Sequence, residues 1–550
     1  MTAKTQRRTR KTRLFIGFEF FISVRYAIFA SFFALLWATP VSGAPRQARE
    51  QERERRILEI QRLFGQGDLV GARKLLDEAA KRFPADAGLD NLQGVIEAQE
   101  GNYAAAERSF RRAVTRDRKF TGAYLNLGRL YQERSAGDPG ALMKAIDVYR
   151  RVLQYDAANA EANYQSAALL MRKGAYRSSL DHLSRLSPKI RESAQVLSVS
   201  CADYAGLGRV ERANETAGRL IAHPDFAESD VVAILPALTG AKRDDLAVEL
   251  LEGLRKRGTL SHDMRRVLGL AYERTGKLAE AREALEQSAS GKGPSAALLA
   301  DLARVARKQR DYRGALGYLA HARDLEPKDA GLHYFFGLVC LDLSLVAEAR
   351  VAFEAALKIE PENPAYNYAM GAASTFRRDP TEAVPYFEKY VRLKPRDARG
   401  KLALGAALMR ADRYDAATRA LTEAAKDSDA AAAAHFYLGA VARRSGRLDA
   451  AVLELRQALK ANPDYADALA ELGQCYLLKK EYESAGELLR RALRIAPDHY
   501  AANFNLLTLY ARTKDEREAA QAARFEEVKK LREEQSRDIL RMIEVYRPWN

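Results

Sequence analysis

The sequence has very little cysteine. Cys201, Cys340 and Cys475 are the only three among 550 residues, and no two of them form a CxxC pair. A Cys-type zinc site needs more thiolates, and a disulfide framework needs a denser set of cysteines in a small chain. We therefore expect three small residues that are buried for packing.

Catalytic and metal-binding motifs are also missing. The seven histidines include no pair four residues apart and no HExxH, and the chain has neither GxxxxGK[ST] nor GxSxG. Gly206-Leu-Gly208 lacks the third glycine and the strand of a dinucleotide fingerprint. Acidic pairs are frequent but lie in charged helix-like stretches. We predict a protein that is not an enzyme, with no catalytic residues, no metal and no cofactor.

Strand-forming residues are sparse as well. Ala, Leu, Arg and Glu dominate the composition, and these residues favour helices, whereas β-branched residues favour strands. Hydrophobic residues make up 47% of the chain, which argues against disorder. The composition therefore predicts an all-α protein.

The net charge is +16, but it is unevenly distributed. Residues 1–43 hold seven basic residues and Glu19, or 7 − 1 = +6, which leaves 16 − 6 = +10 on the rest. An excess of this size over so long a chain fits a solvated, Arg-rich surface. It does not indicate nucleic-acid binding, and it weakly favours acidic partners.

The pattern of the first 43 residues is typical of an export signal. A basic stretch from Lys4 to Arg13 precedes an apolar run, Tyr26 to Leu36, and small residues at Val41 and Gly43 suit cleavage after Gly43. The leader is long, and Val24 is a candidate for the true start if a GTG codon is decoded as Met. The alternative is an uncleaved anchor to the inner membrane at residues 14–41, which would have to accommodate Glu19 and Arg25. Either interpretation places the body outside the cytoplasm.

A period of 34 residues runs through the rest of the chain. Small residues and prolines recur at this interval. The series are Gly337, Gly371, Gly405, Gly439 and Gly473; Ala315, Ala349, Ala383, Ala417, Ala451, Ala485 and Ala519; and Pro327, Pro361 and Pro395, then Pro463 and Pro497. Glycine permits close approach of a second helix, alanine lies where two helices touch, and proline ends one unit. Each unit is therefore expected to be a helical hairpin.

These residues make the chain resemble the tetratricopeptide repeat family. Residues 466–499 carry its pattern in Leu472-Gly473, Tyr476, Ala485, Ala492 and Pro497. The resemblance implies a right-handed superhelical α-solenoid, here of about 13–14 helix–turn–helix repeats. We expect the organisation to be residues 1–43 signal peptide or N-terminal anchor, 53–159 N-terminal repeats, 160–261 degenerate helical repeats, 262–295 one repeat and a flexible joint, 296–533 regular array, and 534–550 capping helix and tail. Extra residues near 135–140 are expected to form a longer loop between two helices.

The resemblance also implies where a ligand would bind. In this family the first helices line a concave groove, and positions 5, 9, 12 and 13 of each unit face it. Position 5 is often aromatic, and the other three are often basic, which would suit a peptide with acidic groups or a free carboxylate. The candidate groove residues are Tyr334, Tyr368, Phe436, Arg304, Arg307, Arg410, Arg443 and Arg444, with Leu402, Phe504, Lys308 and Arg512 at equivalent positions. The aromatics could instead pack between adjacent helices, and the arginines could be solvated.

The function that follows is a non-catalytic scaffold that binds partner proteins or peptides outside the cytoplasm, in the periplasm or secreted. The alternative is recognition of an anionic cell-envelope polymer, or assistance in polysaccharide export. The absence of tryptophan from the repeats, since Trp37 and Trp549 lie outside them, argues against sugar stacking. No nucleic-acid partner is expected, and membrane contact is expected only through an uncleaved N-terminal segment.

Overall fold

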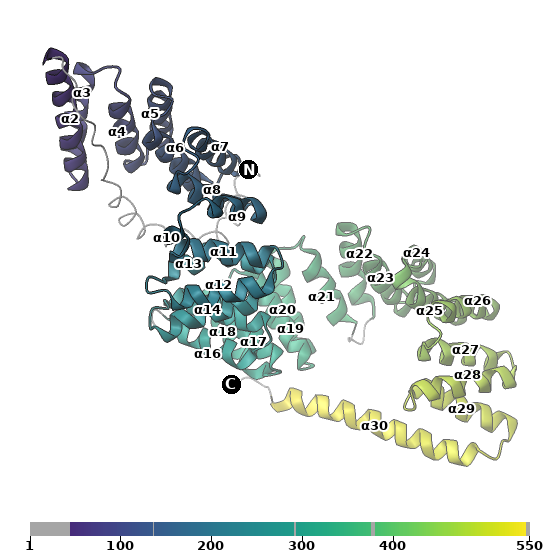
Figure 1. The fold of residues 1–550 in the computed structure, drawn as a ribbon. Coiled ribbons are helices and arrows are strands. Elements are labelled where there is room, and N and C mark those ends of the chain that lie inside the picture. The colour runs from purple at the N-terminus through teal and green to yellow at the C-terminus, as the bar shows by residue number, and fades with distance from the viewer. Residues whose placement is uncertain (1–43, 136, 291–292, 376–379, 546–550) are drawn as a thin grey trace. The chain divides into compact units, whose positions relative to one another are not determined.

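The computed structural model describes residues 44–135, 137–290, 293–375 and 380–545 (Figure 1). The predicted signal or anchor, with its cleavage site, lies outside these residues. The described chain is a succession of helical hairpins without strands, so the prediction of an all-α array of helix–turn–helix repeats is confirmed. The helices form two compact units that divide between Leu260 and Ser261. No helix of the described residues is long and apolar enough to cross a membrane.

Unit 1 contains helices α2 to α14. In chain order the hairpins are α2 (Ala44–Gly65) with α3 (Leu69–Arg82), α4 (Ala87–Gln99) with α5 (Tyr103–Arg116), α6 (Thr121–Arg134) with α7 (Pro139–Tyr155), α8 (Ala160–Arg172) with α9 (Tyr176–Ser184), α11 (Ala194–Gly206) with α12 (Val210–Ala222), and α13 (Glu228–Gly240) with α14 (Asp244–Lys256). A short helix, α10 (Pro188–Arg191), precedes α11.

Unit 2 contains helices α15 to α30. Its hairpins are α15 (His262–Arg274) with α16 (Leu278–Ala289), α17 (Ala296–Lys308) with α18 (Tyr312–Leu325), α19 (Ala330–Asp342) with α20 (Val346–Ile359), α21 (Pro364–Ser374) with the 3-10 turn η2 (Pro380–Ala383) and α22 (Val384–Leu393), α23 (Ala398–Arg410) with α24 (Tyr414–Ala424), α25 (Ser428–Arg444) with α26 (Leu448–Ala461), α27 (Ala466–Leu478) with α28 (Tyr482–Ile495), and α29 (Tyr500–Thr513) with α30 (Glu518–Val545).

The glycines that recur every 34 residues let the two helices of a hairpin pack closely, as the sequence predicts. A Cβ on Gly337 would lie 2.4 Å from the ring of Phe353 on the second helix, and one on Gly439 would lie 2.6 Å from Leu455. Gly405 and Leu421 form the same pair in the hairpin between them. Each glycine thus opens the space that a large side chain fills from sixteen residues further along, within the same hairpin.

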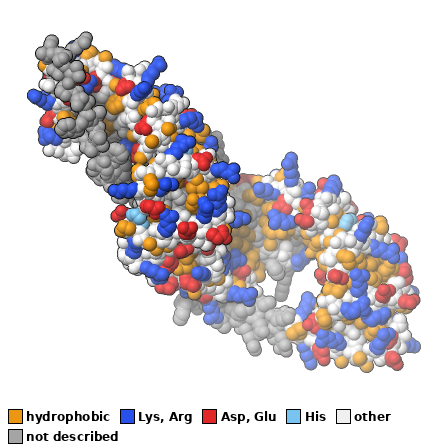
Figure 2. All heavy atoms as spheres, viewed as in Figure 1, with side chains coloured by type: hydrophobic (Ala, Val, Ile, Leu, Met, Phe, Trp, Pro, Cys, Tyr) orange, Lys and Arg blue, Asp and Glu red, His pale blue; other side chains and the backbone are white. Residues whose placement is uncertain are grey.

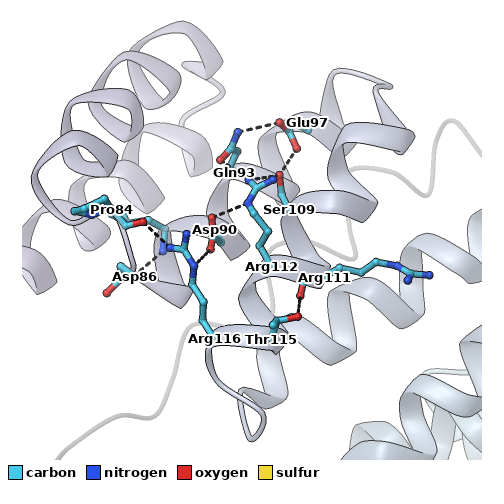
Figure 3. A network of polar contacts seen from close by, with 11 residues as sticks. Pro84, Asp86, Asp90, Gln93, Glu97, Ser109, Arg111, Arg112, Thr115 and Arg116 are labelled. Carbon is cyan, nitrogen blue, oxygen red and sulfur yellow. Dashed lines mark hydrogen bonds and ion pairs between the residues drawn. The ribbon is translucent and has the colours of Figure 1, made fainter.

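The hairpin of α4 and α5 is additionally braced by a polar network (Figure 3). The nearly buried carboxylate of Asp90 on α4 lies 3.2 Å from Nε of Arg112 and 3.1 Å from Nε of Arg116, both on α5. Arg116 also donates to the carbonyl of Pro84 at 2.8 Å, and Ser109 donates to Glu97 at 2.7 Å. These contacts hold α5 against α4 from the C-terminal end of α5, at Arg116, to its middle, at Ser109.

The extra residues near 135–140 lengthen a helix rather than a loop, so that expectation was wrong. Helix α6 ends at Arg134 and α7 begins at Pro139, and α7 has 17 residues where α5 has 14. The cause is local: the carboxylate of Asp138 accepts from the backbone N–H of Gly140, and Pro139 occupies the first turn. An N-cap followed by proline starts a helix, and here it starts one early.

The degenerate region, residues 160–261, keeps the repeat register. The turn between the two helices of a repeat contains one residue with positive φ, and this residue recurs every 34 positions at Gly174, Gly208, Lys242 and Gly276. The expected helical hairpins are therefore present. Leu235, which is 34 residues before Gly269 and so in the glycine position, replaces the small residue in α13. The repeat pattern is weak in this part of the sequence because the side chains at the signature positions differ from those of the other repeats. The backbone nevertheless keeps the 34-residue period.

The three cysteines are free, buried thiols, as predicted. Burial raises the pKa of each of them to about 12, so they are protonated at neutral pH. Cys201 occupies the glycine position of α11, and its thiol lies 3.6 Å from the carbonyl oxygen of Ala213 on the paired helix α12. These residues serve packing.

The last helix, α30, covers the final repeat. Phe525 and Val528 are buried against the rest of the hairpin, with 9% and 3% of their surfaces exposed. The helix is 28 residues long, whereas the second helix of the preceding repeat, α28, has 14. The expected boundary at residue 534 thus falls inside one continuous helix.

Candidate functional site

All eight predicted groove residues lie on first helices of unit 2. Arg304 and Arg307 are on α17, Tyr334 on α19, Tyr368 on α21, Arg410 on α23, and Phe436, Arg443 and Arg444 on α25. The sequence predicts this placement, because the 34-residue period assigns all eight positions to first helices. Their surroundings, however, divide them into three groups.

Two of the three aromatic side chains fill junctions between consecutive repeats. The ring of Tyr334 lies 4.9 Å from that of Tyr366 in the following first helix, and the ring of Phe436 lies 5.2 Å from that of Tyr465, the N-cap of the next one. Tyr368 instead contacts Tyr390 on α22, the second helix of its own repeat, at 5.0 Å and keeps 36% of its surface exposed. Tyr334 and Phe436 therefore contribute mainly to stacking of the repeats, and Tyr368 has the most surface left for a ligand.

Most of the arginines pair with acidic residues of the protein itself. Arg304 contacts Glu273 on the preceding first helix at 2.8 Å and Asp301 one turn away at 2.8 Å. Lys308 lies 2.9 Å from the same Glu273. Although burial alone would raise the pKa of Glu273, the hydrogen bonds from Arg304 and Lys308 hold this pKa below its ordinary value.

The other paired arginines also join neighbouring first helices. Arg307 forms an ion pair with Asp342 of α19. Arg443 lies 2.5 Å from Glu471 of α27. Arg444 donates to the backbone carbonyl of Met409 on α23 at 3.4 Å. Because these cations are already neutralised or satisfied, a ligand would have to displace an internal partner to use them.

Polar side chains of unit 1 show the same self-pairing. The amide of Asn126 on α6 donates to Asn91 on α4 at 3.0 Å, and Arg129 donates to Glu161 on α8 at 3.2 Å. Gln165 also donates to Glu161, at 2.8 Å. The polar residues on these first helices therefore stabilise the stacking of the repeats.

Arg410 is different, because it makes no hydrogen bond or ion pair with the described residues. Its exposed side chain borders a pocket of about 220 Å³ formed by α21, α22, α23 and α25. The lining residues are Ala372, Thr375, Phe387, Ala403, Ala406, Ala407, Arg410 and Tyr437. Burial raises the pKa of the Tyr437 hydroxyl, and the positive charge of Arg410 opposes that rise. The pocket thus combines small apolar walls with one unpaired cation.

Sequence reasoning identified Arg410 but missed the rest of this pocket. The signal that could have found it is a Gly-Ala-Ala triplet, which occurs at residues 371–373 and again one period later at 405–407. Because two alanines follow the packing glycine, no large side chain fills the space between the neighbouring first helices. Alanine was interpreted as a helix former and as a residue where two helices touch, so the cavity it leaves here was not predicted.

The repeats match the tetratricopeptide repeat family model at residues 57–121, 244–297, 300–367, 376–418, 402–458 and 441–499. The chain belongs to this family. Members of the tetratricopeptide repeat family are in general protein–protein interaction scaffolds, and their fold is generally non-catalytic. No group of three or more His, Cys, Asp or Glu side chains in the described part of the chain could hold a metal ion.

Solved structures with the same kind of repeat are distant in sequence. YrrB, described as a tetratricopeptide repeat protein with an unusual peptide-binding site, is 24% identical, with a TM-score of 0.28 over 34% of this chain and 95% of its own. PilF of Pseudomonas aeruginosa is 19% identical, with a TM-score of 0.32 over 37% and 94%. A structure of Naa15/Naa10 bound to HypK-THB is 14% identical, with a TM-score of 0.36 over 87% and 96%. No curated protein matches the sequence.

Basic residues do not gather into one surface patch on the face shown in Figure 2, where Lys and Arg side chains alternate with acidic and apolar ones. The internal ion pairs on the first helices show the same mixing of charges. On this face a ligand would therefore meet mixed charges rather than a broad basic field. Among the described residues that line the pocket, Arg410 is the one basic side chain.

Proposed function

We propose that this protein is an exported scaffold that captures a carboxylate-bearing segment of a partner protein in the pocket beside Arg410. The observation that carries the proposal is the contrast among the predicted arginines. Arg304, Arg307 and Arg443 are neutralised by acidic residues of the chain, whereas Arg410 has no such partner among the described residues and borders a pocket.

The chemistry of the pocket suits a peptide carboxylate. A guanidinium group binds a carboxylate through two parallel N–H donors, which gives direction as well as attraction. The hydroxyls of Tyr437 and Thr375 are additional polar groups in the lining, and four alanine side chains let a peptide backbone come close. An acidic side chain or a free C-terminus of a partner would satisfy the cation, while a small apolar side chain of the same segment would fill the pocket.

Export is supported by the sequence of residues 1–43. The basic start, the apolar run and the small residues before Ala44 follow the order of a secretory signal. N-terminal sequencing of the protein from its native cell tests this part. A mature chain that begins at Ala44 supports cleavage, a chain that retains residues 14–41 supports a membrane anchor, and a chain recovered in the cytoplasm contradicts export.

Site-specific crosslinking tests the binding site. A photo-crosslinking residue replaces Ala406 in the pocket wall, and crosslinked partner peptides from an envelope extract are identified by mass spectrometry. We expect peptides that contain Asp, Glu or a C-terminus. Arg410→Glu should reduce the yield by about tenfold, because charge reversal turns attraction into repulsion.

The matched control is Arg419→Glu, which makes the same charge change at an exposed position of α24, on the second helix of the repeat. It should leave the crosslinks unchanged. Crosslinks that survive Arg410→Glu would contradict the assignment of Arg410. Recovery of an anionic glycan without any peptide would favour recognition of an envelope polymer instead of a protein partner.

A further inference from the structure

A carboxyl group without a bonding partner lies inside the degenerate region. Asp203 of α11 has 0% of its surface exposed, and neither of its carboxyl oxygens has a hydrogen-bond partner among the described residues. The corresponding residue of every other first helix from α4 to α29 is apolar, as Leu169 is in the preceding repeat and Val305 three periods later. A buried polar group without a partner is destabilising, so Asp203 weakens the packing at a position where the other repeats strengthen it.

Helix α9 covers this carboxyl from the preceding repeat. It packs against both α8 and α11 (Figure 1). Ser179 of α9 lies next to Asp203, and the ring of Tyr176 leaves no space for a Cβ on Gly206, one turn further along α11. Ser179 itself occupies the position of the recurring alanines, four periods before Ala315. The contact between α9 and α11 is therefore polar on both sides where other repeats are apolar.

Helix α9 is also weakly held. It has nine residues and begins without a side-chain N-cap, whereas α5 has 14 residues and is capped by Asn102. Two residues of α9, Ser179 and Leu183, are buried, compared with five of α5. A short helix depends on packing for its stability, and elements with few buried contacts open first in native proteins. Local opening of α9 therefore needs less free energy than unfolding of the repeats around it.

No neighbouring charge compensates Asp203. The helices that pack on α11 are α8, α9, α10, α12 and α13, and every charged side chain of α10 and α12 is exposed. On the other three helices the titratable side chains that are at least partly buried are Glu161, Tyr164, Tyr176, His182, Glu228 and Asp230. None of them bonds to Asp203. Nδ1 of His182 instead lies 3.0 Å from the amide oxygen of Asn163, and the hydroxyl of Ser179 donates to the carbonyl of Ala167.

The protonation of this carboxyl therefore controls whether α9 stays on α11. Burial raises the pKa of Asp203 to about 8, because the ionised form has neither water nor a cation beside it while α9 is closed. Opening of α9 admits water and lets Asp203 ionise at its ordinary pKa. We propose that α9 is a pH-controlled flap, which lies closed on α11 while Asp203 is protonated and opens when Asp203 ionises.

The direction of the pH effect follows from Asp203 and His182. For Asp203, the closed state is fully stable below the ordinary pKa of 3.8 and loses stability as pH rises towards 8. His182 acts in the opposite direction, since burial lowers its pKa below the ordinary value of 6.5 and protonation therefore favours the open state at lower pH. The two effects oppose each other below pH 6.5, and the effect of Asp203 remains above it.

Hydrogen exchange of the full chain, followed by mass spectrometry at pH 6.5 and pH 8, tests the flap. After correction for the intrinsic pH dependence of exchange, the opening constant of the α9 amides should rise by about tenfold between the two pH values, and that of α27 and α28 should not change. Asp203→Asn and Asp203→Ala, which remove the ionisable group, should each abolish the rise. The matched control is Asp181→Asn, which removes one negative charge from an exposed position of α9 itself and should leave the rise intact.

An opening constant of α9 that is the same at both pH values would overturn the proposal, as would a rise that persists in Asp203→Asn and Asp203→Ala. An equal rise in every helix from α4 to α14 would also overturn it, because unit 1 would then unfold as a whole rather than open at α9. Circular dichroism confirms that each variant is folded.

Discussion

At the scale of the residue, the carboxyl group of Asp203 lies in an unfavourable environment. Asp203 is completely buried on α11, and neither of its oxygens has a hydrogen-bond partner among the described residues. Burial raises the pKa of this carboxyl to about 8. The hydroxyl of the nearby Ser179 donates to the carbonyl of Ala167 and not to this carboxyl. One and two periods later the same position holds Ala237 and Ala271.

Replacement of this group should therefore stabilise the protein in a pH-dependent way. The folded-state pKa lies above the ordinary value of 3.8, so folding favours the protonated form and stability falls as pH rises from about 4 to about 8. Asp203→Val should gain little near pH 4 and on the order of 2 kcal/mol or more at pH 7. Urea unfolding of both proteins at several pH values measures the difference. A gain that does not change with pH would show that ionisation of Asp203 has no part in it.

At the scale of the element, the turn inside each repeat needs one left-handed residue. Glycine supplies it at Gly446, whereas Lys480 occupies the same position one period later with φ = 65°. Any residue with a Cβ is strained in this conformation, by about 1 kcal/mol. The hydrogen bond from the N–H of Glu481 to the carbonyl of Tyr476, 2.9 Å long, closes the turn in spite of this strain.

Glycine at that turn should strengthen the hairpin of α27 and α28. We expect Lys480→Gly to stabilise it by about 0.5–1 kcal/mol, since relief of strain exceeds the entropy that glycine adds to the unfolded chain. The reciprocal change, Gly446→Ala, should destabilise the preceding hairpin by about 1 kcal/mol. Native-state hydrogen exchange of the amides in each hairpin is the measurement. Equal protection of α27 and α28 amides in Lys480→Gly and the unaltered protein would argue against stored strain.

At the scale of the whole molecule, stability in a repeat array is a sum of local contributions. Each hairpin contacts mainly its neighbours in the sequence, so the loss of one brace should spread only to adjacent repeats. The brace of Asp90 with Arg112 and Arg116 provides a test, because it joins α4 to α5 without contacts to distant repeats.

Asp90→Ala should destabilise its own hairpin by about 1–2 kcal/mol, because it removes the nearly buried carboxylate that pairs with both Arg112 and Arg116. Hydrogen exchange should accelerate in α4 and α5 and, to a smaller degree, in α3 and α6, and remain unchanged in α27 and α28. Asp464→Ala, which removes an exposed carboxylate 3.9 Å from Arg491, should have little effect. Uniform acceleration along the chain would mean that the array unfolds as one cooperative unit.

Much of the fold could be predicted from local spacing. Gly337 and Phe353 are sixteen residues apart and meet within one hairpin, so the periodic pattern determines their contact. The insertion near 135–140 was misplaced because Asp138 and Pro139, which start α7, were interpreted as turn residues. The groove residues were placed on the correct helices, but Arg304 and Arg410 look alike in the sequence. Their difference lies in Glu273, which is 31 residues away from Arg304 and in another repeat.

The sequence by itself determined the helices, their pairing into 34-residue hairpins and the family, because these depend on propensities and on contacts between residues close along the chain. Only the tertiary structure decided which arginine is unpaired, where the alanines leave a pocket, and which aromatic rings stay uncovered. These properties depend on side chains that meet across the stacking of successive repeats. Several partners compete for each charge there, and burial and distance, which the spacing of residues does not encode, select among them.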